Sequence, residues 1–248
     1  MDLPVFFKEN PNTAIAFSGG VDSAYLLYAA AKYGTRTRAY YVKSAFQPQF
    51  ELDDAKRMAN HLHMELRILE ADVLSSKEIS ANSKKRCYFC KKLIFSKILE
   101  AAKKDGFFTL LDGTNASDEA SDRPGMQAVR ELCIRSPLRE CGLTKETIRR
   151  LSKEAGLFTW DKPAYACLAT RIPTGTPITS EKLVHTEHAE DFLRSLGLSD
   201  FRVRSLGNAA KIQVPENQLG IVLAHRTDIL QKLGNDYSDV LLDLATRG

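Results

Sequence analysis

A glycine turn near the start of the chain joins an apolar run to a helix-like stretch. The turn is Ser18-Gly-Gly-Val-Asp-Ser23, the apolar run covers residues 14–17, and the helix-like stretch covers residues 24–31. A strand, a tight turn and a helix start in this order present unpaired backbone N–H groups and the positive end of the helix dipole to an anion. The sequence therefore predicts a strand–turn–helix unit with a phosphate site at its turn.

The composition of the turn indicates which phosphate group it binds. No lysine follows it, and it lacks the spacing of the Walker A pattern, so pyrophosphate recognition is favoured over transfer of a terminal phosphoryl group. The glycines allow a close approach of the backbone, and the serines add hydroxyl groups. Asp22 is open to two roles, because it can orient the ribose or metal of ATP or cap the helix. The predicted nucleotide-binding residues are Ser18, Gly19, Gly20, Val21, Asp22 and Ser23.

Composition narrows the class of protein. Of the 248 residues, 44% are hydrophobic and 27% are charged, which is typical of a soluble globular protein. The formal net charge of +4 suits a phosphorylated small molecule but is too weak to indicate nucleic acid. No apolar stretch is long enough for a membrane span and the start resembles no export signal, so we expect a cytoplasmic protein without a membrane partner. Five cysteines without an export signal favour thiol or metal chemistry over disulfides.

Short apolar strands alternate with helical patterns over the first part of the chain. This alternation predicts an α/β fold with a doubly wound parallel sheet, whose ligands bind at the carboxyl ends of the strands. The stretch 134–136 is a candidate fifth strand. The other expected strands cover residues 14–17, 38–42, 65–69 and 107–112, and the expected helices cover residues 24–33, 52–62, 91–104 and 144–155.

A proline-rich stretch marks the end of this pattern. Residues 163–177 contain three prolines and a glycine, which excludes a long helix and favours a loop that crosses between domains. We therefore expect a nucleotide-binding domain over residues 1–177 and a smaller α/β domain, for substrate or oligomerisation, over residues 178–248. In the second domain we expect helices over 179–196 and 218–233, and strands over 201–206, 211–214 and 240–244.

The cysteines offer a candidate metal centre. Cys87 and Cys90 have CxxC spacing in front of an expected helix, whose N-terminus favours the thiolate form. Two thiolates need further ligands, and Cys167, in the proline-rich loop, is the best third candidate. Three cysteines can hold a cubane iron–sulfur cluster and leave one iron open to an extra sulfide or a substrate. Cys133 and Cys141 lack close metal-ligand spacing, and we interpret them as incidental.

Two arginines form a candidate phosphate clamp in the second domain. Arg202 and Arg204 are two residues apart on an expected strand, so their side chains leave the same face. A pair of guanidinium groups can bind phosphate bidentately. The alternative is an ordinary solvated strand face, on which charged residues also alternate.

The six-residue turn resembles the PP-loop of the ATP pyrophosphatase superfamily, whose members split ATP between its α and β phosphates. Over nearly the whole chain, further segments resemble the LarE family of ATP-dependent sulfur transferases, which act in the synthesis of the nickel-pincer nucleotide cofactor of lactate racemase. These segments cover residues 86–91, 112–116, 123–126, 135–138, 162–164, 167–169, 171–173 and 202–204. The chain differs from the family at Ser205-Leu206, where we expect histidine, so the resemblance does not extend to phosphate contacts from those two positions.

The resemblance implies a reaction and a set of residues. With Mg²⁺ and ATP, a carboxylate of pyridinium-3,5-biscarboxylic acid mononucleotide would be adenylated and converted to a thiocarboxylate with release of AMP. In one branch of the family a cysteine at the position of Cys167 gives up its own sulfur; in the other, three cysteines hold a [4Fe-4S] cluster that delivers an extra sulfide. Because Cys87, Cys90 and Cys167 are all present, the cluster branch is favoured. The resemblance also implies substrate contacts from Arg202, Arg204 and Glu190, although sequence alone favours a helix-surface position for Glu190.

Two other kinds of enzyme and a binding module are alternatives for this sequence. A tRNA thiolation enzyme also combines a PP-loop with cysteines, but it needs a nucleic-acid surface that this weakly basic chain does not indicate. An amide-forming synthetase of the same superfamily has no use for the three cysteines, and neither does a non-enzymatic nucleotide-binding module. The resemblance further implies a homo-oligomer, while the sulfur donor stays unknown.

Overall fold

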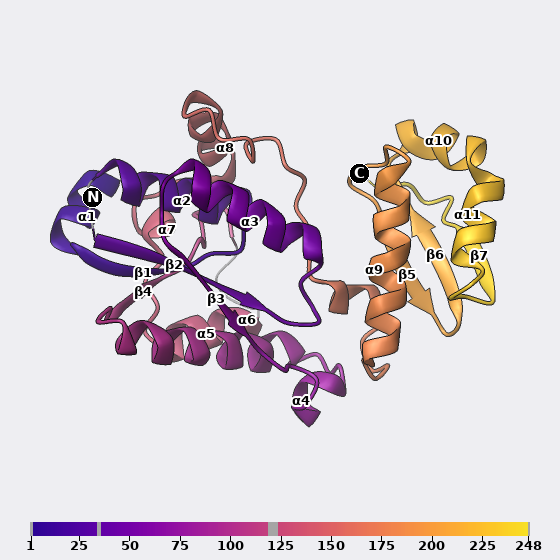
Figure 1. The fold of residues 1–248 in the computed structure, drawn as a ribbon, viewed down its shortest axis with the longest axis horizontal. Helices are drawn as coiled ribbons and strands as arrows, with labels where there is room; N and C mark the ends of the chain where they lie inside the picture. The colour runs from indigo at the N-terminus through magenta and orange to yellow at the C-terminus, as the bar shows by residue number, and fades with distance from the viewer. Residues whose placement is uncertain (1, 34–35, 119–123, 248) are drawn as a thin grey trace. The chain divides into compact units, whose positions relative to one another are not determined.

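The computed structural model describes residues 2–33, 36–118 and 124–247, which divide into two compact units (Figure 1). The first unit consists of residues 1–73 and 85–162, and the second of residues 74–84 and 163–248. The proline-rich stretch 163–177 thus belongs to the second compact unit. The division into domains 1–177 and 178–248 stays a prediction.

A four-stranded parallel sheet forms the centre of the first unit. Its order is β3-β2-β1-β4, with β1 (Asn12–Ala16) between β2 (Arg36–Lys43) and β4 (Thr109–Leu111), and β3 (Leu66–Glu70) at the edge. All three pairings are parallel, which confirms the predicted α/β fold with a doubly wound sheet. The turns after β1 and β4 therefore leave the sheet at the same edge.

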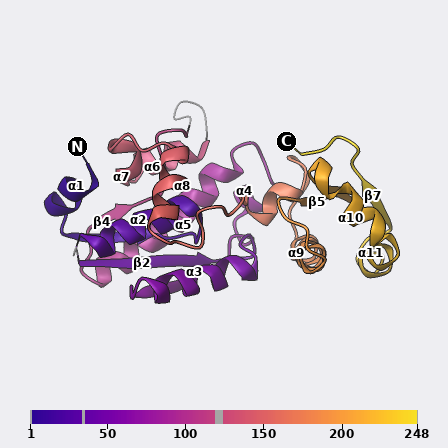
Figure 2. The ribbon, with the colours of Figure 1, turned by 90° about the horizontal axis from the view of Figure 1, so that it is seen from above.

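Helices cover both faces of this sheet. Figure 1 shows α2 (Val21–Lys32) and α3 (Gln49–His61) on one face and α5 (Arg86–Lys104) on the other. Figure 2 shows α8 (Lys145–Glu154) against α2. Because both faces are covered, the inner strands carry continuous apolar runs, at residues 14–16 of β1 and 39–42 of β2. The remaining helices of this unit are α1 (Leu3–Glu9), α6 (Pro124–Glu131) and α7 (Pro137–Glu140).

The helix α3 shows how the sequence pattern produces the packing. Ala55, Met58 and Ala59 recur at helical spacing, and all three are buried. Ala55 and Met58 belong to the same apolar cluster as Ile15 of β1, and Leu62 packs against that cluster at the end of the helix. Burial of such a stripe is the main stabilising contribution to a helix of this length.

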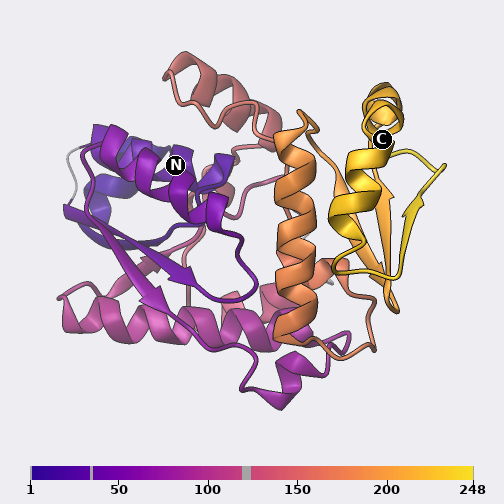
Figure 3. The same cartoon turned by 45° about the vertical axis from the view of Figure 1, so that its right-hand side comes forward.

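The second unit combines a three-stranded sheet with one long helix. β5 (Arg202–Leu206) and β6 (Ala209–Gln213) form an antiparallel hairpin, and β7 (Asp239–Leu242) joins β6 in parallel. Figure 3 shows α9 (Ser180–Ser195), in orange, running beside these strands. The hairpin confirms the strand–turn–strand pattern predicted around Gly207 and Asn208. The other elements are α4 (Lys77–Ser80), η1 (Leu168–Arg171), η2 (Glu216–Gln218), α10 (Leu219–Ala224) and α11 (Arg226–Leu233).

The expected fifth strand at 134–136 is wrong. Only Arg135 forms a β-bridge in this stretch, with Leu111 of β4. Cys133, with a left-handed φ of 53°, precedes the bridge, and Pro137, which begins α7, follows it. Neither residue can extend a strand, because one has the wrong dihedral angle and the other lacks a backbone donor.

The expected continuous helix over 218–233 is also wrong. It is interrupted at His225, whose ψ of 19° lies outside the helical range, so that α10 and α11 are separate helices. A helix that the pattern did not predict, α1, begins after Asp2, whose side chain accepts a hydrogen bond from Val5 N. Within residues 2–33, 36–118 and 124–247, no helix is both long and apolar enough to cross a membrane.

Candidate functional site

The turn between β1 and α2 is built for a close approach of backbone to ligand. Gly19 has a left-handed φ of 74°, and a Cβ atom there would lie 3.1 Å from Glu51 O and 3.3 Å from the Ala55 side chain. Gly20 is the N-cap of α2 and provides no side-chain hydrogen bond. The N–H groups of the first helical turn are therefore not capped by the N-cap side chain and can bind an anion.

The two serines of the turn lie against each other. Ser18 Oγ and Ser23 Oγ are 3.1 Å apart, and Ser23 Oγ donates to Gly20 O over 3.2 Å. Gly20 N donates to Ser18 Oγ over 3.4 Å. Both hydroxyl groups thus stand beside the backbone of the turn, where they can reach the same anion.

A second turn, after β4, adjoins the first one. Asp112 is buried and accepts hydrogen bonds from Thr114 N, Thr114 Oγ1 and Ser136 Oγ at 3.1, 2.6 and 2.7 Å. These bonds fix the turn, and a Cβ atom at Gly113 would lie 2.9 Å from Ser23 N. The glycine thus lets the turn after β4 pack directly on the start of α2.

Two lysines from distant parts of the first unit also reach the turn. Lys145 Nζ, at the start of α8, lies 2.6 Å from Asp22 Oδ2. Lys162 Nζ lies 3.5 Å from Gly19 O and 2.7 Å from Asp54 Oδ2. Sequence spacing predicts no role for either lysine, since each lies more than a hundred residues from its partner in the turn. The fold thus supplies the cations that the loop sequence lacks.

Asp22 lies in the first turn of α2, and the N-cap is Gly20, so its interpretation as the helix cap is wrong. Its Oδ2 atom pairs with Lys145, whereas its Oδ1 atom is buried and has no hydrogen-bond partner within the described ranges. A buried carboxylate oxygen without a donor fits a hard cation such as Mg²⁺, which prefers oxygen ligands. Asp22 is therefore the residue of this site that is best suited to hold a metal ion.

The close contact at Gly19 gives a testable expectation. A Gly19→Ala variant should lose at least about tenfold in ATP-dependent pyrophosphate release, because the new Cβ forces the turn away from α3 and off its anion-binding geometry. Gly142→Ala is the matched control: Gly142 has a similar φ of 71°, but nothing lies within 4 Å of the position of its Cβ. Equal pyrophosphate release rates for the two variants would contradict the close-approach argument.

Cys87 and Cys90 are the second and fifth residues of α5, so they lie inside the helix and not in front of it as expected. Cys87 is exposed, Cys90 is half-buried, and Arg86 Nη2 lies 3.7 Å from Cys87 Sγ. Residues three apart on a helix share a face, so both thiols can bind one metal centre from the first unit. All five cysteines lie within the described ranges and none forms a disulfide there.

Cys133 and Cys141 lie in different surroundings. Cys133 is exposed after α6, whereas Cys141 is half-buried against the main apolar cluster. Burial raises the pKa of the Cys141 thiol above its usual value. Their interpretation as incidental cysteines stays a prediction.

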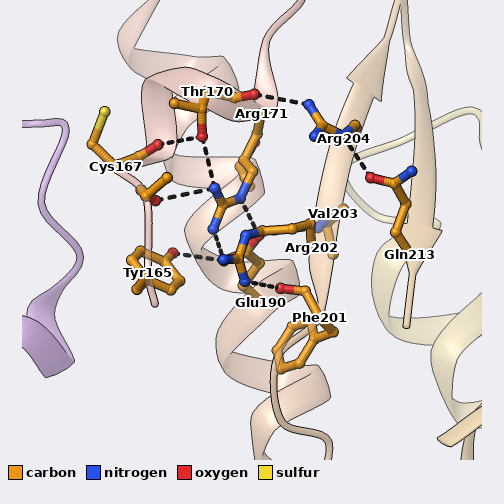
Figure 4. Close-up of polar contacts among 12 residues, drawn as sticks. Tyr165, Cys167, Thr170, Arg171, Glu190, Phe201, Arg202, Val203, Arg204 and Gln213 are labelled. Carbon is orange, nitrogen blue, oxygen red and sulfur yellow. Dashed lines mark hydrogen bonds and ion pairs between the residues drawn. The ribbon is translucent and has the colours of Figure 1, made fainter. Parts of the chain in front are cut away.

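Cys167 lies in the second unit, directly before η1, and Figure 4 shows the residues around it. Its carbonyl accepts hydrogen bonds from Thr170 N at 2.9 Å and Thr170 Oγ1 at 2.8 Å. In Figure 4 its sulfur points away from the polar cluster that includes Arg171 and Glu190. The backbone of Cys167 is thus anchored while its thiol stays outside the cluster.

Glu190 is not a surface residue, so that expectation is wrong. Its side chain is 1% exposed and forms an ion pair with Arg171, with 2.6 Å between Arg171 Nε and Glu190 Oε1. Sequence alone misses the pair, because Arg171 and Glu190 lie in different elements, η1 and α9.

The two candidate clamp arginines bond to the segment around Cys167. Arg202 Nη2 donates to Ala164 O over 2.6 Å, and Arg204 Nη1 donates to Thr170 O over 3.1 Å (Figure 4). Arg202 is buried, and burial together with nearby Arg171 lowers the pKa of Arg202 below its usual value. The alternative of a solvated strand face is therefore wrong for Arg202.

Two positions bear on the family resemblance, and one observation bears on the candidate metal centre. Ser205, where histidine was expected, is buried and donates to Gly207 O over 3.2 Å. Arg123, at the head of one segment that carries the resemblance, lies outside the described residues. Within residues 2–33, 36–118 and 124–247, no three side chains of His, Cys, Asp or Glu are gathered as a metal site would need.

Comparison with known proteins adds to this geometry. Residues 9–116 match the asparagine synthase family. Over 247 residues the chain is 34% identical to pyridinium-3,5-bisthiocarboxylic acid mononucleotide synthase of Lactiplantibacillus plantarum, which covers 98% of this chain and 89% of that protein. It is 37% identical over 221 residues to an uncharacterized protein of Synechocystis, covering 88% and 82% of the two chains.

A more distant similarity covers part of the chain. The tRNA-specific 2-thiouridylase MnmA of Thermotoga maritima is 24% identical over 190 residues, which cover 60% of this chain and 53% of that enzyme. This similarity is lower and shorter than that to the mononucleotide synthase.

Proposed function

The chain belongs to the LarE family of ATP-dependent sulfur transferases, and from this premise we propose that it converts a carboxylate of pyridinium-3,5-biscarboxylic acid mononucleotide to a thiocarboxylate. ATP is the activating substrate, and AMP and pyrophosphate leave. The product would serve the synthesis of a nickel-pincer nucleotide cofactor.

The observation that carries the proposal is the cradle after β1. It combines the backbone N–H groups at the start of α2 with two cations, Lys145 and Lys162. Such a set binds the triphosphate and stabilises the negative charge that develops on leaving pyrophosphate. The residues Ser18, Gly19, Gly20, Val21, Asp22 and Ser23 form the cradle.

Activation of the substrate comes first. A substrate carboxylate oxygen attacks the α-phosphorus of ATP, the bond to the bridging oxygen breaks, and pyrophosphate leaves with the electron pair. Asp22 would hold Mg²⁺ through its Oδ1 atom, and the metal ion, when bound, would neutralise charge on the phosphates. The backbone of the turn and the two lysines then orient the chain of phosphates.

Sulfur transfer follows. A sulfur nucleophile attacks the acyl carbon, the carbon–oxygen bond breaks, and AMP leaves with the electron pair, because the adenylate is a far better leaving group than oxide. Cys167 is the proposed catalytic residue. Arg202 and Arg204 are proposed to bind the substrate phosphate, since each uses two hydrogen bonds to protein oxygens and a guanidinium has five donors.

The source of the sulfur has two alternatives. Cys167 can give up its own sulfur, or Cys87, Cys90 and Cys167 can together hold a [4Fe-4S] cluster; we propose the cluster. The donor set suits it, because three thiols outside disulfides match the ligand chemistry of a cubane that keeps one iron open. When bound, such a cluster supplies an exchangeable sulfide. We further propose that the enzyme acts on a small molecule, is cytoplasmic and forms a homo-oligomer.

Iron analysis separates the two sources. Protein purified under argon should contain about four iron atoms per chain with matching acid-labile sulfide. A Cys90→Ser variant should lose that iron, whereas Cys133→Ser should retain it. Iron-free protein that nevertheless turns over repeatedly would exclude the cluster.

A direct assay tests the whole proposal. The purified chain is supplied with ATP, Mg²⁺ and the biscarboxylated mononucleotide, with sulfide as donor, and mass spectrometry follows AMP and thiocarboxylate. We expect both products to appear together. Thiolation of unmodified tRNA in the same assay, with no AMP released from the mononucleotide, would favour instead the tRNA 2-thiouridylase activity for which the distant Thermotoga relative is named.

A further inference from the structure

Arg171 is among the largest fully buried side chains of the structure. Its guanidinium bonds Glu190 twice, from Nε to Oε1 at 2.6 Å and from Nη2 to Oε2 at 3.2 Å. The remaining Nη1 donates to Ala166 O at 3.0 Å and Thr170 Oγ1 at 2.7 Å. One side chain thus joins the helix α9 to the backbone carbonyl of Ala166, before Cys167, and to the side-chain hydroxyl of Thr170, after it (Figure 4).

The carboxylate of Glu190 has no acceptor site left for a ligand. Besides the two bonds from Arg171, it accepts Tyr165 OH at 2.6 Å and Val203 N at 3.0 Å. A carboxylate has about four lone-pair sites, and these bonds account for all of them. Direct contact of Glu190 with substrate or metal would have to break this arrangement.

The segment that bears Cys167 is held at three of its backbone carbonyl groups, each bonded by a different arginine. Arg202 binds the carbonyl of residue 164, Arg171 that of residue 166, and Arg204 that of residue 170. The carbonyl of Cys167 itself accepts a hydrogen bond from Thr170 Oγ1, and Thr170 Oγ1 in turn accepts one from Arg171 Nη1. The cluster therefore fixes the backbone from which the Cys167 thiol projects.

Stability alone does not explain such an arrangement. Desolvation of two charges offsets most of their attraction, and well-packed apolar residues of similar volume often serve as well. A planar, bidentate guanidinium instead supplies fixed directions for its donors. The geometry suits a device that holds one backbone conformation.

We propose that Arg171 and Glu190 are positioning residues for Cys167, with Tyr165 and Thr170 completing the cluster. The role of these four side chains in sulfur transfer rests on the proposed function, whereas their hold on the backbone around Cys167 does not. Glu190 thereby acts through Arg171 rather than by touching the substrate.

The test uses the full-length chain with Glu190→Gln, which removes the charge of the carboxylate, and Thr170→Val, which removes only the hydroxyl that links Arg171 to Cys167. Two readouts are compared. The first is the rates of pyrophosphate release and thiocarboxylate formation. The second is the rate of Cys167 alkylation by iodoacetamide in full-length chain freed of iron, in which no metal protects this thiol, with Cys133 as internal reference. For both variants we expect thiocarboxylate formation to fall by about a hundredfold with pyrophosphate release retained. Cys167 alkylation should accelerate about tenfold.

Asp191→Asn is the control, since Asp191 is exposed, neighbours Glu190 on α9 and pairs only with Arg194 in the described contacts. It should leave both readouts unchanged. If Thr170→Val, which keeps the buried ion pair, leaves Cys167 alkylation at the rate of the unmodified chain, the positioning role is overturned. A raised KM for the mononucleotide with unchanged alkylation would instead assign Glu190 to substrate binding. Alkylation of Cys167 needs no substrate. It therefore tests whether Arg171 and Glu190 position Cys167 even where the chain makes no thiocarboxylate.

Discussion

Replacing Cys167 with alanine should abolish thiocarboxylate formation while pyrophosphate is still released. In the proposed mechanism the two half-reactions use different units of the structure: the proposed ATP cradle lies in the unit of residues 1–73 and 85–162, and Cys167 lies in the unit of residues 74–84 and 163–248. Removal of the thiol deletes the nucleophile or cluster ligand without touching the turn after β1. We expect at least about a thousandfold loss of sulfur transfer, the scale seen when a nucleophile is removed.

Single-turnover assays measure this effect, with pyrophosphate and thiocarboxylate quantified in the same sample. Cys133→Ala is the matched control, because Cys133 is exposed in the first unit and should be silent in both assays. Intact mass analysis adds a second readout, since a sacrificial Cys167 would leave the chain lighter by H₂S after one turnover. Thiocarboxylate from the Cys167→Ala protein would remove this residue from the reaction.

Besides the parallel sheet, which the alternation of strands and helices predicts, the parts of the fold that sequence reasoning predicts correctly are local ones. The strand, the turn and the helix that form the ATP cradle are contiguous, so apolar runs and glycines specify them without reference to the remainder of the chain. The helix α1 carried a readable signal as well, since Asp2 and a proline at the start are typical of a helix N-terminus. The prediction of a strand over 134–136 failed because the residue types there did not reveal the left-handed φ of Cys133.

The parts that sequence reasoning could not reach are contacts between distant segments. Although residues 162–164 resemble a segment of the family, neither the type nor the spacing of Lys145 and Lys162 indicates that the fold brings both lysines to the turn after β1. Glu190 reads as a surface position because its partner, Arg171, lies in another element. A buried charge is predictable only together with its partner, since either one alone would be too costly to bury. Ion pairs between distant segments are therefore the functional features that the structure reveals and the sequence does not.

Lys162 provides the clearest test of the cradle. A Lys162→Met variant should lose about a hundredfold or more in pyrophosphate release, because it removes a fixed cation from the site where charge develops on the leaving group. The side chain now lies 2.7 Å from Asp54 and 3.5 Å from Gly19 O, so it stands at the turn before ATP arrives. Lys162→Arg keeps the charge and should recover part of the rate.

Two controls isolate the electrostatic effect from folding. Lys56→Met removes an exposed lysine from α3, the helix that also bears Asp54, and should leave pyrophosphate release unchanged. Asp54→Asn breaks the ion pair of Lys162 without removing the cation, and it should retain most of the rate. If Lys162→Met and Lys56→Met release pyrophosphate equally fast at the same melting temperature, Lys162 does not act on the phosphates. If Lys162 acts as the cation that the loop itself lacks, only Lys162→Met should slow pyrophosphate release, and Lys162→Arg should restore part of the rate.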